Sequence, residues 1–354
     1  MSQPVTIVEI AKESGVSIAT VSRVMNGTAP VSEKTRQKVN DAIKKYHYTP
    51  NSLARGLINH QSMTIGIIIP DISNPYFSSM FAAFEKAAQD AGYSVFLCNT
   101  SFYSAARQTE DEPRELKYFQ MLQSKNVDGI LIVGGQADLI SVNKKYSAAL
   151  QYLAASIPVV VLGNPINGVD CQFIQRENGQ GVSTAINYLY SLGHRSIAFV
   201  GGERGVGITE ARLSAYENAL MVLGLPFVRD QIALSDYYTP SGYTATKDLL
   251  KRTTKFTAML TINDNVALGA YRALADAGLR IPDDVSIISC DQFFTADYFV
   301  PRLASIDQHN EQFGRFVIQV LLSAIHGIRE DAQISFSPEL VIRESCAACR
   351  TWNL

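Results

Sequence analysis

The sequence lacks the features that would place the chain in a membrane or outside the cell. It has no run of about 18 apolar residues, and its first residues lack the basic and then apolar segments of a secretory signal. Its five cysteines are few and scattered, which fits a reducing compartment. Cys346 and Cys349 form a C-x-x-C pair that no second pair or nearby histidine completes into a zinc site. We therefore expect a cytoplasmic protein without a bound metal.

Motifs for phosphate binding and catalysis are also missing. Residues 202–209 have the glycine spacing of a Walker A loop, but Ile208 stands where that loop requires its phosphate-binding lysine. The five histidines show no metal-binding spacing. The sequence therefore predicts neither an enzyme nor a cofactor.

The charge is small overall but unevenly distributed along the chain. The 354 residues carry a net charge of −2, with 47% hydrophobic and 18% charged residues, as in a globular protein of two or three domains. Residues 1–61, however, contain eight basic and four acidic residues and so have a net charge of +4, whereas the remainder of the chain has a net charge of −6. The first sixty residues are therefore the part of the chain suited to binding a polyanion.

Residues 6–26 have the pattern of two short helices joined by a tight turn. Thr6 and Glu9 form a capping-box pattern, Gly15 stands where the chain must turn, and Ser17 offers a second N-cap. The apolar positions that would hold the two helices together are Ile7, Ile10, Ala11, Val21 and Val24. This spacing favours a helix-turn-helix, whose second helix enters the DNA major groove by its N-terminal end. The alternative is an ordinary amphipathic helix pair.

A third helix and a short linker follow. Ser32 caps a helix over residues 33–46, which completes a three-helix headpiece. Pro50 then starts a helical segment too short to be stable alone, so it needs DNA or a symmetry mate as a partner. Leu57 could wedge between base steps in a minor groove, with Arg55 against a phosphate. The alternative is a plain interdomain linker.

From Thr64 onward, β-branched apolar runs alternate with amphipathic helical segments. Such short buried runs predict parallel strands covered by helices on both faces, and their number over about 290 residues suggests two sheets. The predicted strands are 65–70, 93–98, 127–133, 157–162, 196–201, 231–235, 256–262, 285–289 and 339–343. The fold class is therefore α/β, with a ligand expected at the carboxyl ends of the strands or between two lobes.

Several segments together resemble the lactose-repressor (LacI/GalR) family of bacterial transcription regulators. The segments that carry the resemblance are VTIVEIAKESGVSIATVSRVMNG, YTPNSLARGL, IGIIIPDISNPYF, GHRSIAFVGG, INDNVALGAYRALADAGLRIPDDVSII and ELVIRESC. It implies a homodimer that reads a palindromic operator, and a body similar to periplasmic sugar-binding proteins. The implied domains are a headpiece (1–48), a hinge helix (49–62) and a two-lobed body (63–354), with lobe 1 at about 63–162 and 293–325 and lobe 2 at about 163–292 and 326–354.

The resemblance also implies the residues that contact DNA. Arg23 is suited to a bidentate contact with guanine. Ile18 and Ala19 would either contact thymine methyl groups or fit into the groove without reading a base. The remaining implied contacts, mainly to phosphates, come from Ser17, Thr20, Ser22 and Asn26, with Arg55 and Leu57 in the hinge.

A second set of residues matches the family's effector site between the lobes. The implied ligand-binding residues are Tyr76, Phe77, Asn164, Arg212, Tyr237, Asn263, Asp291 and Gln308. Aromatic rings with amide and charged groups suit a sugar, although Arg212 could instead form a surface ion pair, Tyr237 a core contact and Asp291 a strand-end cap. Asn164 replaces an aspartate found in several members, and residues 101–115 are longer than the family's usual loop.

The sequence thus predicts a cytoplasmic transcriptional repressor, switched by a small molecule that we expect to be a sugar. Two alternatives remain open at this point. One is a regulator of carbon metabolism controlled by a partner protein, and the other is a solute-binding protein without gene control. The absent secretory signal and the basic first sixty residues argue against the second alternative.

Overall fold

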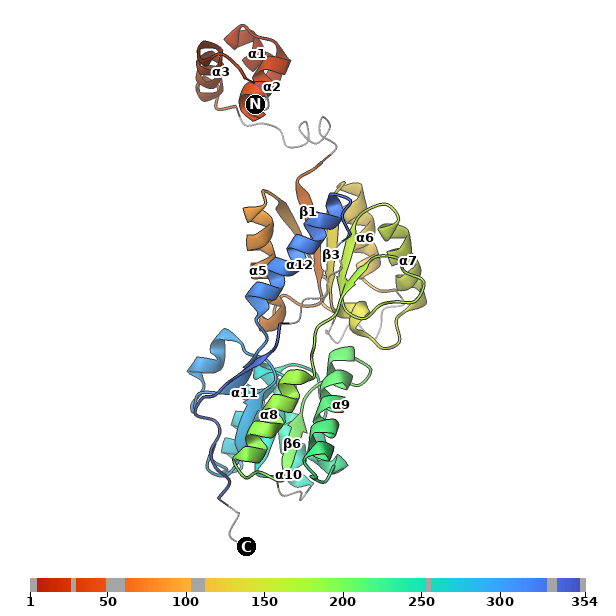
Figure 1. The fold of residues 1–354 in the computed structure, drawn as a ribbon, viewed down its shortest axis with the longest axis vertical. Helices are drawn as coiled ribbons and strands as arrows, with labels where there is room; N and C mark the ends of the chain where they lie inside the picture. The colour runs from red at the N-terminus through yellow and green to blue at the C-terminus, as the bar shows by residue number, and fades with distance from the viewer. Residues whose placement is uncertain are drawn as a thin grey trace. The chain divides into compact units, whose positions relative to one another are not determined.

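The computed structural model describes residues 5–26, 30–48, 61–102, 112–252, 256–329 and 336–350. The chain divides into two compact units, Met1–Met63 and Thr64–Leu354, and Figure 1 labels many of their elements. Within these described ranges, no helix combines the length and the apolar character needed to cross a membrane.

The first unit is a bundle of three short helices. They are α1 (Ile7–Ser14), α2 (Ile18–Asn26) and α3 (Glu33–Lys45). Their shared core is small and consists of the buried side chains of Ile10, Ala11, Val21, Val39 and Ala42. The apolar positions expected to join the helices therefore do so, and a single core holds all three.

The turn between α1 and α2 follows the predicted local chemistry. Glu9 accepts a hydrogen bond from the backbone nitrogen of Thr6 at 2.6 Å, as a capping box requires. Gly15 ends α1 in the left-handed region, with φ at +67°. No atom lies within 4 Å of where a Cβ on Gly15 would stand, so the backbone conformation and not a lack of space favours glycine here.

The second unit contains two α/β lobes, of which the first has a five-stranded parallel sheet. In spatial order its strands are β2 (Ser94–Asn99), β1 (Thr64–Ile69), β3 (Gly129–Val133), β4 (Val159–Leu162) and β5 (Gln172–Ile174). The helices that accompany it are α5 (Pro75–Asp90), α6 (Glu115–Ser124), α7 (Lys144–Ala154) and α12 (Asn310–Ile325). They form two packed pairs, α5 with α12 and α6 with α7.

The second lobe has a six-stranded sheet. In spatial order its strands are β11 (Glu339–Val341), β10 (Ala304–Asp307), β9 (Ser286–Ser289), β8 (Ala258–Thr261), β6 (Ile197–Val200) and β7 (Ile232–Ala233). Only β11 runs antiparallel to its neighbour among these pairs. Its long helices are α8 (Gln180–Ser191), α9 (Gly207–Val222), α10 (Thr239–Lys251) and α11 (Asp264–Asp276).

The chain passes between the lobes more than once, which corrects the lobe boundaries expected from the sequence. The strand at 172–174 pairs with β4 and so extends lobe 1 beyond residue 162, whereas β10 pairs with β9 and so belongs to lobe 2. The later helix α12 then returns to lobe 1, where Figure 1 shows it beside α5. Strand pairing, which a linear pattern does not reveal, decides these boundaries.

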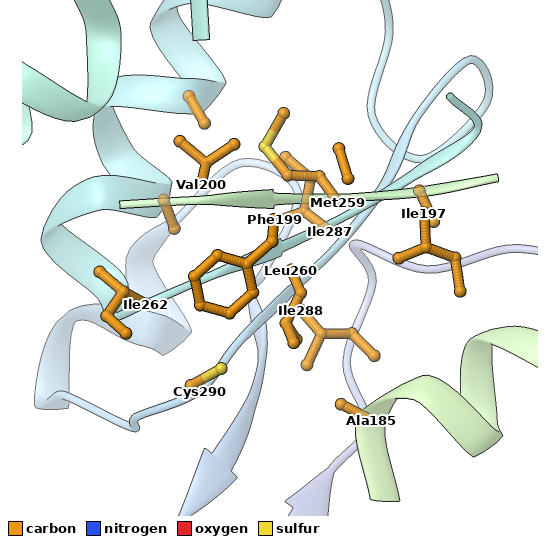
Figure 2. Close-up of a cluster of buried hydrophobic side chains, with 14 of the residues drawn as sticks. Ala185, Ile197, Phe199, Val200, Met259, Leu260, Ile262, Ile287, Ile288 and Cys290 are labelled. Carbon is orange, nitrogen blue, oxygen red and sulfur yellow. The ribbon is translucent and has the colours of Figure 1, made fainter. Parts of the chain in front are cut away.

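The core of the second lobe is formed by its central strands. Figure 2 shows side chains from β6, β8 and β9 gathered around Phe199, Leu260 and Ile288, all fully buried. Phe199 also packs against Tyr216 of α9, with ring centroids 5.6 Å apart. This packing fixes the central strands relative to α9.

We expect Gly15→Ala to destabilise the headpiece by about 1–2 kcal/mol, because the Cβ of alanine lies too close to the following carbonyl oxygen in the left-handed conformation. Gly15→Asn is the matched control, since asparagine tolerates that conformation better and should lose less. Amide hydrogen exchange of α1 and α2 in the full chain measures the loss. Equal protection in the alanine variant and the wild type would contradict this account of the turn.

Candidate functional sites: an exposed helix and a cleft between two lobes

Helix α2 begins at Ser17, as predicted. The Ser17 hydroxyl accepts a hydrogen bond from the backbone nitrogen of Thr20 at 3.2 Å and shares another with the Thr20 hydroxyl at 2.9 Å. A capped helix start keeps the remaining backbone N–H groups of the first turn directed outward, where they suit an anion.

The predicted DNA-contacting residues lie on the surface of α2. Ser17, Ala19 and Arg23 are exposed, Ile18 is 47% exposed, and Thr20 and Ser22 are partly exposed. On the opposite side of the helix Val21 is fully buried. The backbone of Asn26 closes α2, and its side chain lies outside the described residues, as do Arg55 and Leu57. The DNA-contacting roles of all these residues stay predictions.

The second candidate site is a cavity of about 420 Å³ lined by both lobes of the second unit. Seven of the eight predicted ligand-binding residues line it, namely Tyr76, Phe77, Asn164, Arg212, Tyr237, Asn263 and Asp291. Lobe 1 contributes the aromatic pair at the start of α5, and lobe 2 contributes groups that follow its strands. The cavity therefore lies where parallel α/β sheets bind ligands, beyond the carboxyl ends of their strands.

Gln308 is the exception, since it is not among the residues that line the cavity. Its side chain is buried and donates a hydrogen bond to the carbonyl oxygen of Cys290 at 3.1 Å. Its position just after β10 is the expected one, but the side chain holds the segment after β9 instead of reaching the cavity. Its ligand contact therefore stays a prediction, which this arrangement of the side chain does not support.

Arg212 and Asp291 form the central ion pair of the cavity wall. The guanidinium donates to both carboxylate oxygens, at 2.6 and 3.2 Å, and both side chains are almost completely buried. Arg212 also donates to the carbonyl oxygen of Ile262 at 2.5 Å. Burial disfavours the charged guanidinium, but the charge of Asp291, its hydrogen bonds and the neighbouring groups together outweigh burial and hold the pKa of Arg212 above its ordinary value. The alternative of a surface ion pair for Arg212 is therefore wrong.

Asn263 and Tyr237 are held by contacts within the second lobe. The Asn263 side chain caps α11 by accepting from the backbone nitrogen of Val266 at 2.9 Å, and it donates to the carbonyl oxygen of Tyr237 at 3.1 Å. The Tyr237 hydroxyl forms a hydrogen bond of 2.8 Å with the Thr209 hydroxyl. These groups are therefore already oriented when a ligand arrives.

The lobe-1 wall is aromatic. Asn74 caps α5, and the rings of Tyr76 and Phe77 in its first turn meet edge to face with centroids 5.1 Å apart. Phe77 is buried and Tyr76 partly exposed. An apolar ring beside oriented polar groups is an arrangement suited to a polyol, whose C–H faces pack on aromatic rings while its hydroxyls form hydrogen bonds.

Sequence reasoning missed Arg176, which follows the unpredicted strand β5. Its guanidinium donates to Asn310 Oδ1 at 2.8 Å, to the Tyr76 hydroxyl at 3.3 Å and to the carbonyl oxygen of Gln308. It also stacks over Phe313, with Cζ 4.3 Å from the ring centroid. Arg176 thus ties together two of the segments that connect the lobes.

Asp138 is the second cavity-lining residue that sequence reasoning missed. It ends the short 3₁₀ helix η2 (Gly135–Asp138), directly after β3. Its position beyond the carboxyl end of a buried parallel strand was the available signal. Burial raises the pKa of Asp138 to about 7.

Contacts between the lobes in the described part of the chain include two that lie near the cavity. Leu139 and Val206 form an antiparallel backbone bridge, next to which the backbone nitrogen of Ile140 donates to Gly205 at 2.9 Å. Elsewhere the Tyr238 hydroxyl of lobe 2 donates to the Asp71 carboxylate of lobe 1. The cavity walls are therefore joined by contacts that a change in lobe orientation would break.

Of the two departures from the family pattern, Asn164 has an observable setting. Asn164 lies in the wall and accepts a hydrogen bond from Gln175 at 2.9 Å, so its side chain is partly engaged. Most of the extended 101–115 segment, from 103 to 111, lies outside the described residues.

Comparison with known proteins gives consistent matches for both units. Residues 6–51 match the bacterial regulatory proteins of the lacI family, and residues 62–344 match the periplasmic binding proteins and sugar-binding domain of the LacI family. The chain is 33% identical to the HTH-type transcriptional repressor PurR of Histophilus somni (strain 129Pt), over 96% of this chain and 98% of that protein.

Two solved structures are similar over nearly the whole chain. The lac repressor dimer bound to operator and the anti-inducer ONPF has a TM-score of 0.84 at 26% identity, covering 98% of this chain and 100% of that one. The transcriptional regulator CelR in complex with cellobiose has a TM-score of 0.70 at 26% identity, covering 96% and 99%.

We expect Asp291→Asn to lower the free energy of unfolding by about 3–5 kcal/mol, because it leaves the buried Arg212 charge without its partner. Urea unfolding of the full chain measures the loss. The double variant Arg212→Met with Asp291→Leu removes both charges and should lose less than the single variant. A double variant that loses as much stability as Asp291→Asn, or more, would contradict this account of the pair.

Proposed function

The chain belongs to the LacI family of bacterial regulatory proteins, which makes it a DNA-binding transcriptional regulator and not an enzyme, and we propose that it represses genes by binding a palindromic operator as a homodimer. We also propose that a small-molecule effector controls this binding. The main support is the cavity, where aromatic rings of lobe 1 and the buried Arg212–Asp291 pair of lobe 2 line the same space. We place its action in the cytoplasm, where bacterial DNA lies.

On the DNA side, α2 is the helix that enters the major groove. Its exposed residues from Ser17 to Arg23 project from a helix that the buried Val21 anchors to the headpiece core. Arg23 reads a guanine through two parallel hydrogen bonds, and the hydroxyls of Ser17, Thr20 and Ser22 contact phosphates. Two headpieces in a dimer then read two half-sites of inverted sequence. Leu57 in the hinge inserts between base steps of the minor groove.

On the ligand side, the effector is a small sugar held between the lobes. Support comes from the match of the body to sugar-binding domains and from the cellobiose complex of the similar regulator CelR. The cavity volume of about 420 Å³ suits a mono- or disaccharide. Its two arginines already donate hydrogen bonds, Arg212 to Asp291 and Arg176 to neutral oxygens, which favours a neutral sugar over a phosphate.

The ligand switches the protein by favouring one orientation of the lobes. A sugar that contacts both walls stabilises the arrangement in which the Leu139–Val206 bridge and the Tyr238–Asp71 contact form. A ligand shifts such an equilibrium only by its difference in affinity for the two arrangements. The lobe orientation sets the spacing of the hinge segments in the dimer, and that spacing controls operator binding.

We expect at least one of ribose, glucose and cellobiose to raise the melting temperature, because a ligand at 100 times its dissociation constant adds about 2.7 kcal/mol to native-state stability. Tyr76→Ala removes an aromatic wall of the cavity and should abolish the shift. Tyr152→Ala is the control, since Tyr152 is 74% exposed and is not among the residues lining the cavity. A shift that survives in Tyr76→Ala would argue against this cavity as the sugar site.

We expect Arg23→Ala to weaken operator binding by about 1–3 kcal/mol and to relax base preference at one position of each half-site. Arg36→Ala is the matched control, since Arg36 is an exposed arginine on α3 outside the proposed reading surface. Binding to a randomised operator library at fixed salt measures both effects. Unchanged base preference in Arg23→Ala would remove Arg23 from the base-reading residues.

A further inference from the structure

We propose that Asp138 is a specificity-determining residue of the cleft, whose carboxylate receives hydroxyl or ammonium donors of the sugar and selects against phosphorylated sugars. This inference rests on the proposed function of the cavity and adds to it the charge class of the ligand. The carboxyl group of Asp138 lies in lobe 1 and is not part of the Arg212–Asp291 ion pair of lobe 2.

The Asp138 carboxyl lines the cavity and is open to a ligand. Among the described residues, its carboxylate makes no hydrogen bond or ion pair, and burial is the one cause that shifts its pKa. Its place is set by the backbone of Gly134, where a Cβ would stand 2.8 Å from Asp138 Oδ2. Gly134 also has a φ of +63°. Glycine at position 134 therefore leaves room for the carboxyl group at the end of η2.

Several other polar groups of the walls already have partners. Arg212 and Asp291 pair with each other, although Arg212 Nε has no hydrogen-bond partner among the described residues, and Asn263 caps α11. Arg176 donates to three neutral oxygens, including that of Asn310. A buried acceptor without a donor is costly, and a ligand that supplies one recovers that cost on binding. Asp138 is therefore an acceptor at which a ligand's donors contribute to affinity.

The charges of the cavity point to the same class of ligand. Its walls carry three carboxyl groups, Asp138, Glu177 and Asp291, against two arginines, Arg176 and Arg212. An ionised Asp138 therefore leaves an excess of negative charge, which a phosphate ester would increase in a site partly shielded from water. Hydroxyl or ammonium donors stabilise the carboxylate instead.

Asp138 also adjoins the contact between the lobes. The next residue, Leu139, forms the backbone bridge to Val206, which directly precedes α9 and its Arg212. A ligand held by Asp138 and by the Arg212–Asp291 pair thus spans both sides of this bridge. Recognition at Asp138 is therefore placed where it acts on the relative position of the lobes.

The first test measures binding of ribose, glucose, cellobiose, glucosamine and glucose 6-phosphate by calorimetry at pH 8. We expect a sugar that binds the wild type to bind Asp138→Asn about tenfold or more weakly, as for loss of a charge-assisted hydrogen bond. Asp248→Asn, an exposed aspartate of α10 paired with Lys251, is the control and should bind like the wild type. Glucose 6-phosphate should bind the wild type more weakly than glucose.

Two results of this test would overturn the proposal. One is unchanged sugar affinity in Asp138→Asn, and the other is tighter binding of glucose 6-phosphate than of glucose to the wild type. If no sugar of the panel binds, the proposed sugar effector is wrong, and the role of Asp138 is then decided by a second measurement that needs no ligand.

The second measurement compares the urea stability of Asp138→Asn and Asp264→Asn between pH 5 and pH 8. Burial raises the pKa of both carboxyls to about 7, but Asp264 accepts hydrogen bonds from Ser289 at 2.5 Å and from the backbone of Phe293 at 2.8 Å. The hydroxyls of Tyr146 and Tyr237 interact electrostatically with Asp138, and burial raises the pKa values of both well above this range.

A carboxyl whose pKa is raised on folding stabilises the native state at low pH, and this contribution is lost as pH rises through the folded pKa. Asp138→Asn should therefore gain stability relative to the wild type from pH 5 to pH 8, as expected for a carboxyl kept for a ligand. Asp264→Asn should be less stable than the wild type throughout, because it loses accepted hydrogen bonds. If Asp138→Asn is also less stable at every pH, Asp138 is structural and the proposal fails.

Discussion

The buried pair of Arg212 and Asp291 is the interaction on which the arrangement of the cleft depends. It joins α9 to the segment after β9, and the third hydrogen bond of Arg212 reaches Ile262 after β8. Three elements that are separate in the sequence therefore meet at one guanidinium. Desolvation offsets much of the attraction, so the pair adds less to overall stability than to the uniqueness of this geometry.

This geometry explains why the two lobes have different roles in binding. Lobe 2 presents groups that its own hydrogen bonds have already oriented, such as Asn263 at the start of α11. Lobe 1 presents the aromatic rings of α5 and the carboxyl of Asp138. A ligand therefore meets a rigid polar wall on one side and an apolar wall with one open acceptor on the other, and it gains most when both walls contact it.

The parts of the structure that follow from local chemistry could be predicted from the sequence, whereas those that depend on strand pairing could not. Ser17 and Gly15 were identified correctly because an N-cap and a left-handed turn involve only neighbouring residues. Arg176 was missed because β5 has three residues, too few to show a pattern. Gln308 has the expected position, but the contact its side chain makes depends on Cys290, which is distant in the sequence.

The return of α12 to lobe 1 has a consequence for how the protein is made on the ribosome. The helix that packs on α5 and contacts β3 and β4 is synthesised only after β10 of lobe 2. During translation the first sheet is therefore complete in strands while part of its apolar surface still lacks its cover. The apolar surface of lobe 1 that α12 will cover stays exposed while nearly all of lobe 2 is synthesised. This interval is when chaperones have the greatest opportunity to bind the chain.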